Sequence, residues 1–293
     1  MSADRRSFLK GVLGAGAAAA ASAVPVSASE APREAPEDAV GLLYDTTLCI
    51  GCKTCVVACR EANDLDPDTS NDPLHDAPTA LNAQTKNIIK LYKDNDGRRS
   101  YMKQQCMHCV DPACVGACMI GAFQKREYGI VTWDGDRCIG CRYCQVACPY
   151  QVPKFEWASR TPQIVKCELC NHRLAEGKEP GCTEVCPRNA VIFGTRDELL
   201  AEAHRRLEEN PGRYVDRIYG EHDGGGTQCL YLSHIPFENL GLPELGDESH
   251  SSLNRQVQHG IYQGFVAPVA LYAVLGGVAF RNRRVQAKEG GDE

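Results

Sequence analysis

The fold is decided by two nearly identical peptides, CIGCKTCVVAC at residues 49–59 and CIGCRYCQVAC at residues 138–148. Each has the cysteine order C-x2-C-x2-C-x3-C, which is the ligand pattern of bacterial ferredoxins. Because the first three thiols are three residues apart, a short loop can wrap them around one face of a [4Fe–4S] cubane. Gly51 and Gly140 in the first gap allow the tight backbone that points amide N–H groups at sulfur. The two peptides therefore predict iron–sulfur clusters.

Two further groups of cysteines extend this pattern, each with a longer gap before its third cysteine. Sixteen of the seventeen cysteines thus fall into four quartets, enough for four [4Fe–4S] clusters with four thiolate ligands each. The remaining Cys229 has no neighbouring thiol in the sequence, so we interpret it as a small packed residue. The quartets are Cys49, Cys52, Cys55 and Cys59; Cys106, Cys109, Cys114 and Cys118; Cys138, Cys141, Cys144 and Cys148; and Cys167, Cys170, Cys182 and Cys186.

Three other uses of cysteine explain the quartets less well. A zinc ribbon binds one tetrahedral metal with two C-x2-C pairs and has no use for the further cysteines of each run. A disulfide framework is typical of small secreted domains, whereas 293 residues suffice for an ordinary core. Cysteines buried merely as small apolar residues would not recur at fixed intervals. His108 and His172 lie inside the motifs, but each motif already has four thiols, so we expect neither histidine to bind iron.

The order of the quartets indicates an internal duplication. The first and third are nearly the same peptide, and the second and fourth are followed by Ala122-Phe123 and Ala190-Val191 at matching offsets. Two ferredoxin units of two clusters each explain this order. In two-cluster ferredoxins the fourth cysteine of a run binds the other cluster, but spacing alone leaves open which runs exchange it. We expect an α+β fold of tandem ferredoxin-like modules.

The quartet order, the CMHC start of the second quartet and the CELC start of the fourth carry a family resemblance. Over roughly residues 40–210 the chain resembles the four-cluster ferredoxin subunits of respiratory oxidoreductases, the beta subunits of the dimethyl-sulfoxide-reductase type. That family nests its motifs, the first with the fourth and the second with the third. The resemblance therefore implies four ligand sets: Cys49, Cys52, Cys55 and Cys186; Cys167, Cys170, Cys182 and Cys59; Cys106, Cys109, Cys114 and Cys148; and Cys138, Cys141, Cys144 and Cys118.

Residues 1–28 have the features of an export signal. Arg5-Arg6 precede Phe8-Leu9-Lys10 and an alanine-rich run, which is typical of a twin-arginine signal, and small residues permit cleavage after Ala28. A membrane anchor is the alternative, but the run is short and mostly alanine. Because clusters are assembled in the cytoplasm, only an exporter of folded proteins can move them intact. We expect a cluster domain that is exported to the periplasm.

Residues 260–280 are predicted to form a transmembrane helix. Ile261 to Phe280 are twenty residues without a charge, which is about the length needed to cross a bilayer. Arg281, Arg283 and Arg284 follow, and basic residues stay on the cytoplasmic side. This places the tail at residues 281–293 in the cytoplasm and the cluster domain at the periplasmic face of the inner membrane. A buried core helix is the alternative.

Between these ends we expect a cluster domain over residues 29–210 and an extended arm over residues 211–259 that covers a partner. Residues 87–92 and 101–103 flank a DNDG turn and predict a hairpin, and residues 129–133 and 190–193 predict short strands. Thr195 and Glu198 form a capping box ahead of a helix through Glu209. The arm is rich in glycine, proline, serine and acidic residues.

No catalytic pattern accompanies the cysteines in the sequence. We find no Ser-His-Asp pattern, no paired carboxylates and no nucleotide-binding loop. A formal net charge of −6 also gives no basic footprint for nucleic acid. We therefore expect an electron-transfer subunit that has no substrate site of its own.

Within the family, the chain is most similar to the electron-transfer subunits of membrane-bound [NiFe] hydrogenases of the hydrogenase-2 type. The export signal, the single C-terminal span and the GGGTQ segment at residues 224–228 carry this resemblance. It implies three partners: the small and large hydrogenase subunits and a multi-span quinone-binding membrane subunit. Two alternatives stay open. One is the beta subunit of a molybdenum or tungsten oxidoreductase such as formate dehydrogenase, and the other is a cluster-bearing assembly or redox-sensing module.

Overall fold

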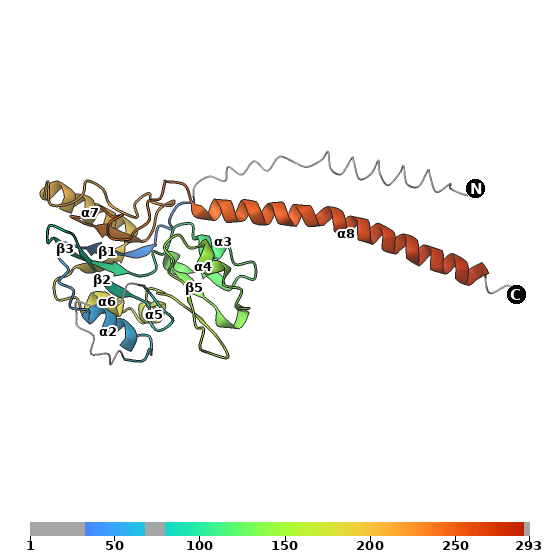
Figure 1. The fold of residues 1–293 in the computed structure, drawn as a ribbon, viewed down its shortest axis with the longest axis horizontal. Helices are drawn as coiled ribbons and strands as arrows, with labels where there is room; N and C mark the ends of the chain where they lie inside the picture. Colours follow the sequence, from blue (N-terminus) through green and yellow to red (C-terminus); the bar gives the residue numbers. More distant parts are fainter. Residues whose placement is uncertain (1–32, 68–79, 290–293) are drawn as a thin grey trace. The chain divides into compact units, whose positions relative to one another are not determined.

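The computed structural model of the chain describes residues 33–67 and 80–289 (Figure 1). The export signal expected over residues 1–28 lies outside these ranges, as do the last four residues of the expected cytoplasmic tail. Residues 30–254 form one compact unit, and residues 255–289 belong to a second unit, in which they are helical. The compact unit contains all seventeen cysteines, and no disulfide joins any of them.

A three-stranded sheet in the order β8-β1-β9 lies in the compact unit. β1 (Val40–Asp45) pairs antiparallel with β8 (Val191–Thr195) and parallel with β9 (Cys229–Leu232). Because β1 lies between two strands and is buried along nearly its whole length, its sequence VGLLYD is an apolar run rather than an alternating one. The sheet thus joins the first strand of the unit to two strands from its C-terminal half.

Three hairpins accompany this sheet. In the first, the amide of Arg98 donates to Asp94 Oδ1 at 2.7 Å and closes the turn at the DNDG sequence. This hairpin and the two short strands near residues 131 and 191 confirm the sequence predictions. The hairpins are β2 (Ile88–Lys93) with β3 (Arg99–Gln104), β4 (Phe123–Lys125) with β5 (Val131–Trp133), and β6 (Lys154–Phe155) with β7 (Ile164–Val165).

Short helices follow the cysteine pairs. None of the five has more than eight residues, so each supplies only one or two turns that return the chain toward the preceding loop. They are α2 (Thr54–Glu61), α3 (Ala113–Gly116), α4 (Tyr143–Ala147), α5 (Asn171–Ala175) and α6 (Gly181–Glu184), and two 3-10 turns lie at Glu127–Gly129 and Gly135–Arg137. This mixture of short helices and antiparallel hairpins is the mixed α and β content expected of a ferredoxin-type domain.

Helix α7 (Arg196–Glu209) packs on the central sheet. Its capping box is as predicted: the Thr195 hydroxyl accepts from the Glu198 amide at 3.3 Å, and the Glu198 carboxylate accepts from the Thr195 amide at 3.1 Å. Leu199 and Ala203 are buried in one cluster with Leu43 of β1 and with residues of β9. The helix therefore covers one face of the sheet.

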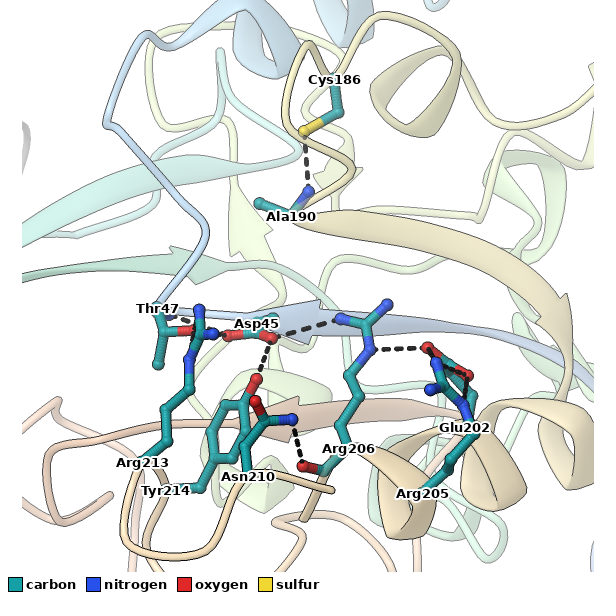
Figure 2. A network of polar contacts seen from close by, with 10 residues as sticks. All are labelled: Asp45, Thr47, Cys186, Ala190, Glu202, Arg205, Arg206, Asn210, Arg213 and Tyr214. Carbon is teal, nitrogen blue, oxygen red and sulfur yellow. Dashed lines mark hydrogen bonds and ion pairs between the residues drawn. The ribbon is translucent and has the colours of Figure 1, made fainter. Parts of the chain in front are cut away.

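A polar network fastens α7 and the segment after it to the end of β1 (Figure 2). Arg206 Nη1 donates to Asp45 Oδ2 at 3.2 Å, and the Tyr214 hydroxyl donates to the same carboxylate oxygen at 2.9 Å. Asp45 is completely buried, and the Arg206 side chain is 15% exposed. Glu202 accepts a further bond from Arg206 at 2.7 Å. The carboxylate of Asp45 thus joins three separate segments.

The segment after α7 differs from the sequence prediction. We expected an extended arm over residues 211–259, but β9 belongs to the central sheet and the compact unit continues to residue 254. Ile218, Tyr219 and Leu230 are almost completely buried, and Tyr219 exchanges two backbone hydrogen bonds with Tyr231. The arm prediction was wrong because these apolar residues are scattered among glycines and prolines, so no periodic pattern marks them.

Helix α8 runs from His250 to Glu289 and contains Pro268. It begins before residue 260, where we expected the membrane span to start. Several large apolar side chains in its second half are exposed, among them Val269, Tyr272 and Val274. Within residues 33–67 and 80–289, no helix combines the length and the hydropathy of a membrane span.

Candidate iron–sulfur cluster sites

A left-handed residue precedes the second cysteine of every quartet. The φ angle is +71° at Gly51 and +70° at Gly140, but it is also positive at His108 (+47°) and Leu169 (+53°). The glycines were predictable, whereas the other two were not, because residues with a Cβ rarely adopt this conformation. In the first and fourth quartets this residue's amide donates to the Sγ of the first cysteine, at 3.4 Å in both.

The third cysteine of every quartet is the second residue of a short helix. Cys55 lies in α2, Cys114 in α3, Cys144 in α4 and Cys182 in α6. The helix begins after the loop that holds the first two thiols, so its first turn carries the third. The quartets therefore share one local design despite their different spacings.

The fourth cysteines of the second and fourth quartets also share a contact. The amide of Ala122 donates to Cys118 Sγ at 3.2 Å, and the amide of Ala190 donates to Cys186 Sγ at 3.2 Å (Figure 2). These alanines are the residues that the sequence places at matching offsets. The duplication is therefore visible in hydrogen bonds as well as in sequence.

The structure brings Cys186 together with the first three cysteines of the first quartet, a set that we name group A. Cys49, Cys52, Cys55 and Cys186 line one cavity, and Tyr44 lines it with them. Burial raises the pKa of Cys55, and the thiols of Cys49, Cys52 and Cys186 raise it further. Group A thus contains one cysteine from the far end of the cluster motifs.

Group B consists of Cys59, Cys167, Cys170 and Cys182. Burial raises the pKa of Cys59 well above its usual range, and the other three thiols of the group raise it further. Asn63 Nδ2 donates to Cys59 Sγ at 3.7 Å and to Cys170 Sγ at 3.9 Å, so one side chain bridges the first and fourth quartets.

The two remaining groups join the second and third quartets. In group C, burial raises the pKa of Cys114, and the neighbouring thiols raise it further. In group D, burial raises the pKa of Cys144 to about 12, again with contributions from its neighbours. The four groups are the sets that the family resemblance implies. Group C is Cys106, Cys109, Cys114 and Cys148, and group D is Cys118, Cys138, Cys141 and Cys144.

Neighbouring groups are connected in the order A, B, C, D. Helix α2 carries Cys55 of group A and Cys59 of group B, and Cys144 of group D precedes Cys148 of group C by one helical turn. Between B and C, the Cys167 thiol acts directly on the pKa of Cys106. Only two of the seventeen cysteines are exposed, Cys52 in group A and Cys141 in group D. The row is thus accessible at its two ends.

Each of the four groups offers four thiolate donors, which is the ligand set of one [4Fe–4S] cluster. Among residues 33–67 and 80–289, no three His, Cys, Asp or Glu side chains converge on a point that one ion could occupy. A cubane does not require such convergence, because each of its four thiolates binds a different iron.

A buried lysine also shows whether the four groups of thiols fit iron–sulfur clusters. Lys103 is completely buried, and its Nζ has no hydrogen-bond partner in the structure. Burial acts to lower the pKa of Lys103, but the thiols of groups A and B outweigh burial and keep the pKa raised. An unpaired ammonium among thiols fits an anionic, thiolate-bound group. Sequence analysis missed this residue, because nothing in its local sequence indicates that it is buried.

The two motif histidines and Cys229 lie outside the four groups. His108 is buried, its Nδ1 accepts from the Val131 amide at 3.1 Å, and burial lowers its pKa well below the usual value. His172 is exposed. Cys229 is buried on β9, and its Sγ donates to the Cys106 carbonyl at 3.2 Å. Cys229 is therefore a packed core residue, as the sequence predicts.

Comparison with known proteins identifies relatives along the whole chain. Residues 98–196 match the family of 4Fe-4S dicluster domains. The chain is 39% identical to the hydrogenase-2 operon protein HybA of Escherichia coli O157:H7 over 325 aligned positions, which cover 99% of each chain. It is 37% identical to the formate dehydrogenase-O iron–sulfur subunit of E. coli K12 over 218 positions, 71% of this chain and 72% of that one. A formate dehydrogenase iron–sulfur subunit of Haemophilus influenzae is 32% identical over 82% of this chain and 77% of its own.

Proposed function

This chain belongs to the HybA family of ferredoxin-type iron–sulfur subunits, and we propose that it relays electrons between a periplasmic [NiFe] hydrogenase and a quinone-binding membrane subunit. It is an electron-transfer subunit of a hydrogenase complex and not its catalytic subunit. The observation that carries the proposed route is the row of groups A to D, with one exposed cysteine at each end.

Groups A, B, C and D would each hold one [4Fe–4S] cluster. Such a cluster stores and releases one electron at a time, at a potential set by charge, hydrogen bonds and exposure. The residues of the chain supply these conditions. Seven of the sixteen thiols are buried, which keeps water away from the middle of the row, and amides such as those of Gly51 and Ala190 donate to the sulfurs. The exposed Cys52 and Cys141 mark where electrons would enter and leave.

The position of this row at the membrane is part of the proposal. The twin-arginine sequence at residues 5–6 supports export of the folded chain, and the apolar run at residues 261–280 supports a C-terminal anchor. Arg281, Arg283 and Arg284 after the run support a cytoplasmic tail. The exposed apolar side chains of α8, such as Tyr272 and Val274, agree with a helix that is covered by lipid or by a membrane partner.

Membrane extraction tests the anchor. We expect the chain to stay in the membrane fraction after a carbonate wash and to be released by mild detergent. Truncation after residue 254 keeps the compact unit complete, so it should release a soluble, cluster-bearing chain. Release of the full-length chain by carbonate alone contradicts the anchor and leaves the electron-transfer function untouched.

The alternative partner is a molybdenum or tungsten enzyme such as formate dehydrogenase. The formate dehydrogenase subunits match 71% and 82% of this chain, whereas the match to HybA extends over 99%. Metal analysis of the complex purified in mild detergent separates the two proposals. Nickel without molybdenum or tungsten supports the hydrogenase, and molybdenum or tungsten in stoichiometric amounts contradicts it.

A further inference from the structure

Lys103 is buried near two groups of thiols. It lies on β3, and the exposed fraction of the residue is 0%. The thiols that act on its ammonium group are Cys55 of group A and Cys59, Cys167 and Cys182 of group B. Met102, the preceding residue, packs in one buried cluster with Cys167 and Cys182 of group B, and Cys49 and Cys55 of group A pack against that cluster. This part of β3 therefore lies at the junction of the first two groups in the row.

The backbone around Lys103 holds this position. Lys103 pairs with Ile89 in the β2–β3 hairpin, and its carbonyl accepts a hydrogen bond from the Tyr231 hydroxyl at 2.9 Å. Its neighbour Met102 is buried as well. The ammonium group thus belongs to the core and is not a surface charge that has folded inward.

A buried ammonium group without a counter-charge is strongly unfavourable. In the described part of the chain, Nζ of Lys103 has neither a carboxylate nor a carbonyl as a hydrogen-bond partner. The compensating negative charge must therefore come from the thiol side. Thiolate ligation leaves a cubane site net anionic, and each added electron makes it more so. A fixed positive charge beside such a site favours its reduced form.

We propose that Lys103 sets the reduction potentials of the two sites formed by groups A and B, raising both. Because one ammonium group lies between them, it shifts both sites in the same direction and keeps electron exchange between them balanced. This inference rests on the proposed function, since groups A and B must hold clusters. Lys103 acts through its charge on the sites and binds no iron itself.

Lys166 and group D provide contrasts within the same chain. Lys166 is also buried, but its Nζ donates to the carbonyls of Val131 and Cys167, the latter at 2.8 Å, so backbone oxygens share its charge. No lysine is among the main influences on the pKa of Cys144 in group D. The site of group D therefore serves as an internal reference whose potential should not depend on Lys103.

The test uses the complete complex with Lys103→Met, Lys103→Arg and the control Lys93→Met. Lys93 ends β2 in the same hairpin and is exposed, so its replacement removes the same charge from the surface. Iron content and redox titrations followed by EPR are measured for each variant. We expect Lys103→Met to lower the reduction equilibrium constants of sites A and B at least tenfold, which is about 59 mV for one electron. In Lys103→Met the reduction potential of site D should stay close to the wild-type value. In Lys93→Met and in Lys103→Arg, which keeps the charge, the potentials of sites A and B should stay close to wild type as well.

Unchanged potentials at sites A and B in a Lys103→Met complex with full iron content overturn the assignment. If Lys103→Met loses iron, Lys103→Arg decides the outcome. Full iron and wild-type potentials in Lys103→Arg show that the charge is required, whereas iron loss in both variants shows a packing role and overturns the assignment. A wild-type complex that lacks clusters A and B contradicts the proposed function itself, and no variant is needed to see it.

Discussion

The backbone amide of Ala190 donates a hydrogen bond to Cys186 Sγ at 3.2 Å (Figure 2). Cys186 lies among the thiols of the first quartet. Its counterpart in the duplicated unit, Cys118, receives the same bond from Ala122 and lies beside Cys144. In each ferredoxin unit, the amide of an alanine thus holds the cysteine that joins the thiols of the other unit. At Cys186 and Cys118, a local hydrogen bond therefore holds a cysteine that lies beside thiols far away in the sequence.

The pairing predicts the effect of removing each exchanged cysteine. Cys186→Ser should abolish or alter the EPR signal that Cys49→Ser affects, because both thiols belong to group A. Cys118→Ser should affect the signal that Cys138→Ser affects, because both belong to group D. EPR of the reduced complex with these four variants gives the comparison. The nested arrangement fails if Cys186→Ser instead matches Cys138→Ser.

The duplicated glycines predict an unequal response to the same substitution. Alanine at Gly51 or Gly140 must adopt a φ near +70°, which costs about 1–2 kcal/mol at either position. A Cβ at Gly51 would also lie 2.2 Å from the Tyr101 ring, whereas at Gly140 the nearest atom is 3.5 Å away on Phe155. We expect Gly51→Ala to lose iron from site A and Gly140→Ala to keep site D largely filled. Equal iron loss in the two variants would show that the Tyr101 contact is irrelevant.

The buried carboxylate at the end of β1 predicts a large loss of stability. Asp45→Asn removes the buried charge that Arg206 and Tyr214 contact, and it leaves Arg206 with Glu202 as its remaining ion-pair partner. We expect the free energy of unfolding to fall by about 2 kcal/mol, because hydrogen bonds to a buried charged group are lost. Thermal unfolding followed by circular dichroism measures the effect. As a control, Glu209→Gln breaks an exposed ion pair with Arg205 and should cost less than about 0.5 kcal/mol.

Replacing Cys229, the cysteine outside the four groups, should leave every cluster in place. Cys229→Ala removes a buried thiol that donates to the Cys106 carbonyl and accepts from Gln105 Nε2. We expect a loss of about 1 kcal/mol in stability and no loss of iron or sulfide. A loss of about four irons per chain, the content of one cubane, would make Cys229 a ligand and would break the four-by-four assignment.

Features that depend on a few consecutive residues were predictable from the sequence. The DNDG turn closes the β2–β3 hairpin through Asp94 and Arg98, and the capping box needs only Thr195 and Glu198. The grouping of Cys186 with Cys49 required the family resemblance, because it depends on how the two ferredoxin units pack. The cysteine spacing alone predicted the four quartets, but it left open which quartets exchange their fourth cysteine.

Features that depend on distant segments were not predictable. β9 is a strand because β1 lies beside it, and its own sequence lies in a stretch without periodicity. Lys103 is buried because residues of both ferredoxin units and Tyr231 surround it, although an isolated lysine on a hairpin is normally a surface residue. His108 and Leu169 adopt a left-handed backbone that residues with a Cβ rarely adopt, and no glycine marks this conformation in the sequence.

The most direct test of a four-cluster electron relay is the iron and acid-labile sulfide content contributed by this chain. The measurement compares the intact complex, purified in mild detergent, with the hydrogenase purified from cells that lack this chain. The predicted difference is about sixteen irons and about sixteen sulfides per copy, from four irons and four sulfides in each cubane. A difference of about eight irons, or zinc in place of iron, would contradict it.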